Sequence, residues 1–193
     1  MEVITLNKEV FSQKCSELVL KLDLQPELIV GILNGGRYVV DEIKNDFSKT
    51  HIELVKLKRK LEWIDYLAKP FILKSFSKDV RDELRKYKAK NTEKSVDKLD
   101  LFELSKCKFD LKLDITEKEK VKTILIIDDA IDTGRTMFVV MNNLRKLFPK
   151  SEIKTAVISW TMENSIVKPD YYLFKQVLVR FPWSKDYKEQ DFE

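Results

Sequence analysis

Three carboxylates, a glycine and two threonines lie close together in the middle of the chain. The stretch ILIIDDAIDTGRTM, residues 124–137, starts with an apolar run and continues with Asp128, Asp129 and Asp132. An apolar run followed by a polar turn and helical spacing is typical of a strand that leads into the N-terminus of a helix. Amides at such an N-terminus bind phosphate, and paired carboxylates accept hydrogen bonds from sugar hydroxyls. The stretch therefore predicts a site for a sugar phosphate.

Three other interpretations of the stretch fit the rest of the chain less well. A Walker B acid needs a phosphate loop of the form G-x-x-x-x-G-K-[ST], which glycines at positions 31, 35, 36 and 134 do not supply. A phosphoryl-accepting pair of the receiver type normally follows the first strand of its domain, whereas this pair lies beyond residue 120. A helix cap needs only one acid, and three clustered acids repel one another unless a cation or a sugar lies between them.

The chain around this stretch alternates between strand-like and helix-like patterns. Strands are predicted at 27–33, 51–57, 122–127, 152–160 and 176–181, and helices at 7–22, 37–47 and 135–148. Because this alternation is typical of α/β proteins, we expect a doubly wound, mainly parallel sheet flanked by helices. Ligands of such sheets bind at the carboxyl ends of the strands, which is where the three acids lie.

Residues at about 59–121 interrupt this alternation. The segment is rich in lysine, contains no glycine, and has Leu61, Ile64 and Leu67 at helical spacing. Within it, DVRDELRKYK places acids and bases where they pair along a helix. We therefore expect a single domain over residues 1–193 that carries a mostly helical insertion.

Composition narrows the class of protein. Apolar residues make up 44% and charged residues 35% of the chain, which is typical of a globular domain with a charged surface. No apolar run is long enough to span a membrane, and the N-terminus lacks the pattern of a signal peptide. Cys15 and Cys107 lie far apart and suit free thiols in the cytoplasm. The net charge of +4 arises from mixed charges, so neither a membrane nor a nucleic acid is an expected partner.

The stretch at 124–137 resembles the 5-phosphoribosyl-1-pyrophosphate (PRPP) signature of type I phosphoribosyltransferases, in which two acids and two further residues precede D-T-G-x-T. VGILNGGRYVVDEI, residues 30–43, resembles the pyrophosphate loop of that family. VKPDYY and VRFPW, near the C-terminus, resemble the base-binding hood of the 6-oxopurine enzymes, the hypoxanthine, guanine and xanthine phosphoribosyltransferases. The resemblance implies the type I fold with a small hood at about 160–187, and it leaves the insertion out.

The resemblance also implies roles for individual residues around PRPP. Asp128 and Asp129 would hold the ribose hydroxyls, with Asp129 also near a Mg²⁺ ion, and Asp132 would be the general acid/base beside the purine N7. The 5′-phosphate would lie against Thr133, Gly134, Arg135 and Thr136. The pyrophosphate would bind Asn34, Gly35, Gly36 and Lys58, next to a peptide bond between Leu33 and Asn34 that is often strained in the family.

The hood residues imply how a base would be recognised. Lys168 would donate a hydrogen bond to the purine O6, which favours 6-oxopurines over adenine. The position that usually holds a stacking aromatic falls at Leu178, or at Val177 if the register shifts by one, and Val179 would also contact the base. This departs from the family, because an aliphatic side chain holds a base less well than an aromatic face.

Three further hood positions bear on the metal and on packing. Ser184 stands where an acid often helps to bind a second magnesium ion, and Asp186 follows two residues later. Trp183, next to a proline, is as consistent with packing as with a hood contact.

Taken with these motifs, the resemblance implies a cytoplasmic, Mg²⁺-dependent purine salvage enzyme. It would transfer ribose 5-phosphate from PRPP to a purine base, a 6-oxopurine, and release pyrophosphate, as a homo-oligomer such as a dimer or tetramer. The alternative is a PRPP-binding regulatory or effector protein that kept the pocket without efficient base transfer. A purely structural domain is disfavoured, because both the PRPP stretch and the pyrophosphate loop are intact.

Overall fold

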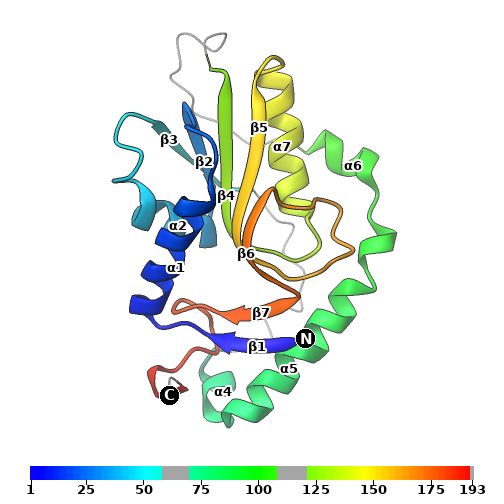
Figure 1. Ribbon diagram of the computed structural model, residues 1–193. Helices are drawn as coiled ribbons and strands as arrows, with labels where there is room; N and C mark the ends of the chain where they lie inside the picture. The colour runs from blue at the N-terminus through cyan, green and yellow to red at the C-terminus, as the bar shows by residue number, and fades with distance from the viewer. Residues whose placement is uncertain (58–69, 108–120, 192–193) are drawn as a thin grey trace.

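A five-stranded parallel sheet forms the centre of the computed structural model, which describes residues 1–57, 70–107 and 121–191 (Figure 1). The strands lie in the order β3-β2-β4-β5-β6 and every neighbouring pair is parallel. Their bounds are β2 Leu28–Ile32, β3 His51–Val55, β4 Thr123–Ile131, β5 Glu152–Trp160 and β6 Tyr171–Lys175. The middle strand is β4, which carries the acids singled out in the sequence.

Helices cover both faces of this sheet. On one face, α1 (Lys8–Lys21) and α2 (Gly35–Ile43) pack against Ile29, Leu125 and Ile127. On the other face, α7 (Arg135–Leu147) packs against the alternate residues of the same strands, such as Val30 and Ile126. Strands buried on both faces need continuous apolar runs, which is why LIVGI and ILII read so clearly as strands. The predicted doubly wound α/β sheet is confirmed.

Two short strands form a separate sheet beyond the carboxyl ends of the main one. β1 (Glu2–Thr5) pairs in parallel with β7 (Val177–Arg180), and this pair is the hood (Figure 1). The sequence did not predict β1 or β6, whereas the strand predicted at 176–181 is present as β7. β4 also ends four residues later than the predicted 122–127, at Ile131, so that Asp128 and Asp129 lie on the strand itself.

The described part of the insertion, residues 70–107, is helical. Its elements are α4 (Pro70–Ser75), α5 (Lys78–Glu93), the 3₁₀ turn η1 (Val96–Lys98) and α6 (Leu101–Lys106). α5 runs diagonally past the hood, while α6 lies against α7 (Figure 1). A last 3₁₀ turn, η3 (Glu189–Asp191), ends the described chain.

Charged side chains join α5 to the hood and to the C-terminal segment. The pairs are Arg81–Asp191 at 2.6 Å, Arg85–Asp186 at 2.6 Å, Arg180–Asp186 at 3.1 Å and Arg180–Asp82. The side chains of Arg81 and Arg180 are almost completely buried, so their ion pairs lie in the interior and are not surface ion pairs.

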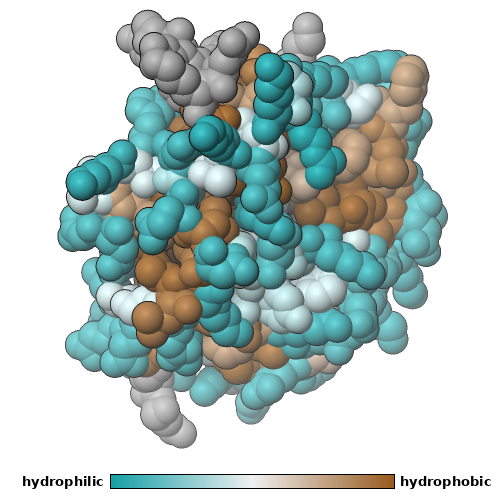
Figure 2. All heavy atoms as spheres, turned by 45° about the horizontal axis from the view of Figure 1, so that its top comes forward, coloured by the Kyte–Doolittle hydropathy of each residue, from teal (hydrophilic) through white to brown (hydrophobic). Residues whose placement is uncertain are grey.

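The surface view in Figure 2 is mostly hydrophilic, with apolar areas that include one on the side of α6 and α7. Exposed apolar side chains of these helices include Leu101, Phe102 and Leu147. Over the ranges that the structure describes, no helix combines the length and apolar character needed to cross a bilayer.

Candidate active site

The acids of β4 and the loop after β2 meet at the carboxyl end of the sheet. β2 and β4 are hydrogen-bonded neighbours, with Gly31 opposite Ile127, so the turn after β2 passes over the end of β4. A Cβ at Gly36 would lie 2.4 Å from the backbone oxygen of Ile127. Only a residue without a side chain lets the N-terminus of α2 approach the strand this closely.

The neighbouring glycine touches one of the acids. A Cβ at Gly35 would lie 2.1 Å from the carboxyl group of Asp129, so this carboxyl group rests directly on the backbone of the predicted pyrophosphate loop. The peptide bond between Leu33 and Asn34, singled out in the sequence, is cis. The structure therefore brings together Asn34, Gly35, Gly36 and Asp129, while Lys58 lies outside the described residues.

Both oxygens of the Asp129 carboxyl group accept hydrogen bonds from the protein. The backbone N–H of Ala130 donates to Oδ1 at 2.9 Å, and Nε1 of Trp183 donates to Oδ2 at 3.1 Å. Burial raises the pKa of Asp129 and the nearby charge of Asp132 adds to this, whereas a side-chain hydrogen bond with Asp128 and the two hydrogen bonds above oppose the rise. Such a buried acid gains from a cation or a polar ligand at its remaining lone pairs.

The other two acids differ from Asp129 in their surroundings. Asp128 is half-buried, and its Oδ1 accepts a hydrogen bond from the backbone N–H of Asp129 at 2.9 Å. Asp132 lies just past the end of β4 and is exposed. One short segment thus offers two half-buried carboxylates, Asp128 and Asp129, and an exposed one, Asp132.

The turn between β4 and α7 has the form of an anion-binding helix N-terminus. Gly134, the N-cap of α7, adopts φ 81°, a left-handed conformation that favours glycine, and it has no side chain with which to cap the helix. The hydroxyl of Thr133 accepts the N–H of Arg135 at 3.3 Å. Thr133 and Thr136 are half-buried and Arg135 is exposed. The backbone oxygen of Thr133 accepts a hydrogen bond from the N–H of Ile166 at 3.0 Å, which anchors the turn to the loop between β5 and β6. These amides and hydroxyls suit a phosphate group.

The proposed base contacts do not gather around one open recess. Leu178 and Val179 point to opposite faces of β7, and both are buried. Leu178, 7% exposed, packs with Ala89 and Val96 of the insertion, whereas Val179 belongs to the core over α1. Lys168 is exposed in the loop between β5 and β6. No pattern in the sequence indicated that the insertion would cover Leu178.

Hood residues that could have held a second metal ion have other partners. Ser184 Oγ accepts a hydrogen bond from the N–H of Phe181 at 3.0 Å. Burial alone would raise the pKa of Asp186, but hydrogen bonds and charges from Arg85 and Arg180 hold it at about 2. At neutral pH Asp186 is therefore an ionised partner of two arginines.

The acids fit magnesium through the chemistry of their donors. Mg²⁺ prefers oxygen ligands, and it commonly binds through one or two carboxylates together with substrate phosphates. Within the described ranges, no three or more His, Cys, Asp or Glu residues are grouped so as to hold a metal ion on their own. Asp129, with Asp128 beside it, therefore suits a magnesium ion that arrives with a phosphorylated substrate.

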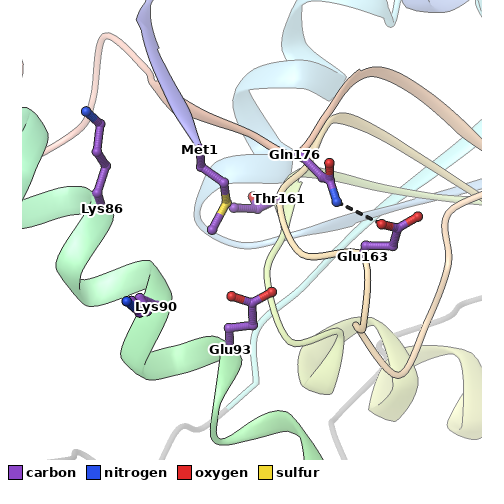
Figure 3. A pocket seen from close by; sticks show the side chains of 7 residues that line it. All are labelled: Met1, Lys86, Lys90, Glu93, Thr161, Glu163 and Gln176. Atoms are coloured by element: carbon purple, nitrogen blue, oxygen red, sulfur yellow. Dashed lines mark hydrogen bonds between the residues drawn. The ribbon is translucent and has the colours of Figure 1, made fainter.

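A hollow of about 410 Å³ lies between α5 and the loops that follow β5 and β6 (Figure 3). Its lining residues are Met1, Lys86, Lys90, Glu93, Thr161, Glu163 and Gln176. The N–H of Thr161 donates to the backbone oxygen of Ile131 at 2.8 Å, so the hollow begins one strand away from Asp132. Its lining mixes acids and bases, and Glu163 already binds Lys175 and Gln176.

Comparisons with known proteins agree with this geometry. The model of the phosphoribosyl transferase domain family matches residues 5–190. No protein among curated sequences matches the chain. A purine phosphoribosyltransferase from Pyrococcus horikoshii superposes with a TM-score of 0.60 at 22% identity, covering 95% of each chain. The xanthine-guanine-hypoxanthine phosphoribosyltransferase of Helicobacter pylori gives 0.59 at 15% identity, covering 94% of this chain and 90% of that one.

A third similar structure is a Neisseria gonorrhoeae protein with bound ppGpp. Its TM-score is 0.59 at 13% identity, and the match covers 98% of this chain and 92% of that one. At these identities the structural matches establish the fold.

Proposed function

Because this chain belongs to the phosphoribosyltransferase family and has its type I fold, we propose that it transfers ribose 5-phosphate from PRPP to a 6-oxopurine. The observation that carries this proposal is the contact between Gly35 and Asp129, which joins the pyrophosphate loop to the PRPP acids. A single substrate that carries both a pyrophosphate and a ribose would span these two motifs.

The proposed reaction breaks the bond between C1′ of the ribose and a pyrophosphate oxygen, and the bond electrons leave with pyrophosphate. Positive charge then develops on the sugar, where the fixed carboxylates of Asp128 and Asp129 favour it. Backbone amides at Asn34 and Gly35 would hold the leaving group. Magnesium, when bound at Asp129 and Asp128, would neutralise the charge of pyrophosphate.

On the base side, a purine nitrogen forms the new bond to C1′. Asp132 would take the proton that the ring loses at N7 and return one in the reverse reaction, as a general acid/base. Its exposed position beyond β4 leaves it accessible to such a ring. Thr133 to Thr136 would fix the 5′-phosphate and so hold the sugar in line with the base.

The 6-oxopurine preference rests on Lys168, whose ammonium group would donate to O6. Two of the similar structures are purine phosphoribosyltransferases by name, which supports a purine for this chain as well. We further propose a purine salvage role in the cytoplasm, since both cysteines are free thiols. A dimer or tetramer is proposed from the resemblance, and sedimentation analysis tests it.

A PRPP-binding regulatory protein is the second candidate, and one observation favours it. Leu178, the position expected to face a base, is covered by Ala89 and Val96 of the insertion. A base could stack on Leu178 only if these contacts opened. In this candidate function the protein binds PRPP but does not transfer its ribose 5-phosphate to a base.

Incubation with PRPP, Mg²⁺ and a panel of purines and pyrimidines distinguishes the two candidates. The enzyme is expected to form nucleotide and pyrophosphate from hypoxanthine, guanine or xanthine and to reject adenine, whose amino group mismatches Lys168. Lys168→Ala should narrow the gap between the oxopurine and adenine. PRPP binding without any nucleotide would establish the regulatory candidate, and use of adenine or a pyrimidine would refute the proposed role of Lys168.

A further inference from the structure

Trp183 lies at the centre of an aromatic cluster that joins three parts of the site. Its ring stacks on Tyr38 at 4.2 Å and on Phe181 at 4.9 Å, with interplanar angles of 16° and 7°. Phe11 of α1 meets it edge-on at 4.8 Å. Tyr38 belongs to α2, which begins at the pyrophosphate loop, and Phe181 follows the hood strand β7. The indole is therefore held on both faces and at its edge.

The same indole donates its only N–H to a PRPP acid. Nε1 of Trp183 lies 3.1 Å from Oδ2 of Asp129, while Oδ1 receives the N–H of Ala130. The backbone of Gly35 lies against this carboxyl group, too close for any side chain. Donors at both oxygens and a backbone contact fix the orientation of the Asp129 carboxylate.

This orientation is not a consequence of β4 alone. A carboxylate that made only the Ala130 contact could rotate about its side-chain bonds, because one hydrogen bond leaves the second oxygen unplaced. The Trp183 contact spans 54 residues of sequence and places that second oxygen. Packing against Tyr38 and Phe181 keeps the donor itself in place, since stacked rings have little freedom to move.

We propose that Trp183 is a positioning residue for PRPP: its indole N–H holds the Asp129 carboxylate in the orientation that receives the ribose hydroxyls and the accompanying magnesium. The proposal rests on the proposed function, because it assigns PRPP to Asp129. Trp183 itself does not touch the substrate. It acts only through the carboxylate that it orients.

Calorimetric titration of PRPP in the presence of Mg²⁺ tests the proposal by a binding constant rather than by activity. Trp183→Phe keeps a stacking ring and removes the donor, so the Kd for PRPP is expected to rise about tenfold to a hundredfold, the range for one hydrogen bond to a charged group. Replacing the Trp183 indole by benzothiophene, which has the same shape and no N–H, should give the same rise without disturbing the packing.

The chain offers a matched control in Trp160. Its Nε1 donates to Ser165 Oγ at 2.9 Å rather than to one of the β4 acids, so Trp160→Phe also loses one indole hydrogen bond. Both Trp→Phe variants should melt at a lower temperature than the wild type, but only Trp183→Phe should bind PRPP more weakly. A similar loss of affinity in both variants would show that Trp183 acts through general stability and would overturn the proposal.

A double-mutant cycle separates action through Asp129 from any other route. If Trp183 acts only through this carboxylate, adding Trp183→Phe to Asp129→Asn should change the Kd for PRPP by less than about twofold. A further tenfold loss in the double variant would contradict the proposal. If the wild-type protein does not bind PRPP with Mg²⁺, the proposed function is refuted. If the wild type binds PRPP and both Trp183 variants bind it equally well, only the role of Trp183 is refuted.

Discussion

Asp132 differs from its two neighbouring acids because it is exposed and lies beyond the end of β4. Asp129 is fixed by two donors, and Asp128 receives a backbone N–H, so these two acids have the rigid placement that a binding role needs. An exposed carboxylate at this position is accessible to a bound base. These differences agree with the proposed roles, in which Asp128 and Asp129 bind PRPP and Asp132 transfers a proton.

The first prediction separates these roles. Asp132→Asn should leave the Kd for PRPP within about twofold of the wild type and lower kcat by about two to four orders of magnitude, the usual range for a general acid–base group. Calorimetry and steady-state kinetics measure the two quantities. Asp128→Asn serves as the control and should weaken PRPP binding. Wild-type turnover by Asp132→Asn would disprove its catalytic role.

Substitutions at the two adjacent glycines of the proposed pyrophosphate loop should have different effects, one on PRPP binding and the other on stability. A Cβ at Gly35 would meet the carboxyl group of Asp129, whereas a Cβ at Gly36 would meet the backbone oxygen of Ile127. A side chain can move away, but the backbone of the central strand cannot do so without disturbing the sheet. Gly35→Ala should therefore weaken PRPP binding at least tenfold with a small change in melting temperature. Gly36→Ala should chiefly lower the melting temperature, and the reverse pattern would contradict this assignment.

Among the elements, α5 depends on charge for its docking. Arg180 is completely buried and binds Asp82 of α5 as well as Asp186. Removing one member of a buried ion pair leaves the other charge without its partner, at a cost of about 3–5 kcal/mol. Arg180→Met should therefore destabilise the fold by this amount in denaturant unfolding. Arg145→Met, at an exposed position of α7, should change stability by less than about 0.5 kcal/mol.

The same contacts predict how stability depends on pH. Arg85 and Arg180 hold the pKa of Asp186 at about 2, below the usual value near 3.8, and Arg81 lowers the pKa of Asp191. An acid whose pKa is depressed by folding stabilises the fold above its unfolded pKa. This contribution is lost as the pH falls through about 4 toward 2. Stability measured over this window should therefore drop more steeply for the wild type than for Asp186→Asn, and parallel curves would contradict the assignment.

At the scale of elements, the sequence predicted those strands and turns whose structure depends on their own residues rather than on distant contacts. Buried parallel strands need unbroken apolar runs, so β2, β4 and β5 were evident, and the β4–α7 turn followed from its glycine and threonines. β1 has four residues, too few to show a period, and it is stable only because it pairs with β7 across the length of the chain. The contact between Trp183 and Asp129 could not be predicted either, because the sequence around a tryptophan does not indicate which acceptor its indole N–H binds.

The sequence predicted that the insertion is mostly helical, but it did not predict which part of the fold the insertion packs against. The spacing of acids and bases in DVRDELRKYK suggested pairs along one helix face. In the structure, Glu83 and Lys86 do pair along the helix at 2.7 Å. Other charges of the stretch, Arg81, Asp82 and Arg85, pair with the hood and the C-terminal segment. A sequence does not reveal whether a charge faces water or a distant partner. Covering of Leu178 by this segment is a tertiary consequence of the same docking.

On the scale of the whole molecule, the two cysteines differ in solvent exposure and should react with a thiol reagent under different conditions. Cys15 is 1% exposed in the core beneath α1, and burial raises the pKa of its thiol, with the charge of Glu42 adding to the effect. A thiol reagent needs an accessible thiolate, so Cys15 should react only when the core opens. Cys107 is exposed and should react at once. One thiol per native chain should therefore react rapidly, and two should react in denaturant.

The last prediction uses Cys15 to detect PRPP from within the core. Cys15 packs in the same cluster as Val39 and Val40 of α2, the helix that begins at the pyrophosphate loop. A ligand that binds only the folded state lowers the opened population by the factor 1 + [L]/Kd, about a hundredfold when PRPP is at 100 times its Kd. PRPP with Mg²⁺ should slow the labelling of Cys15 by about this factor and leave Cys107 unchanged. In Asp128→Asn the same PRPP concentration should slow it much less. Equal labelling of Cys15 with and without PRPP, in protein shown by calorimetry to bind it, would mean that this part of the core opens without the site.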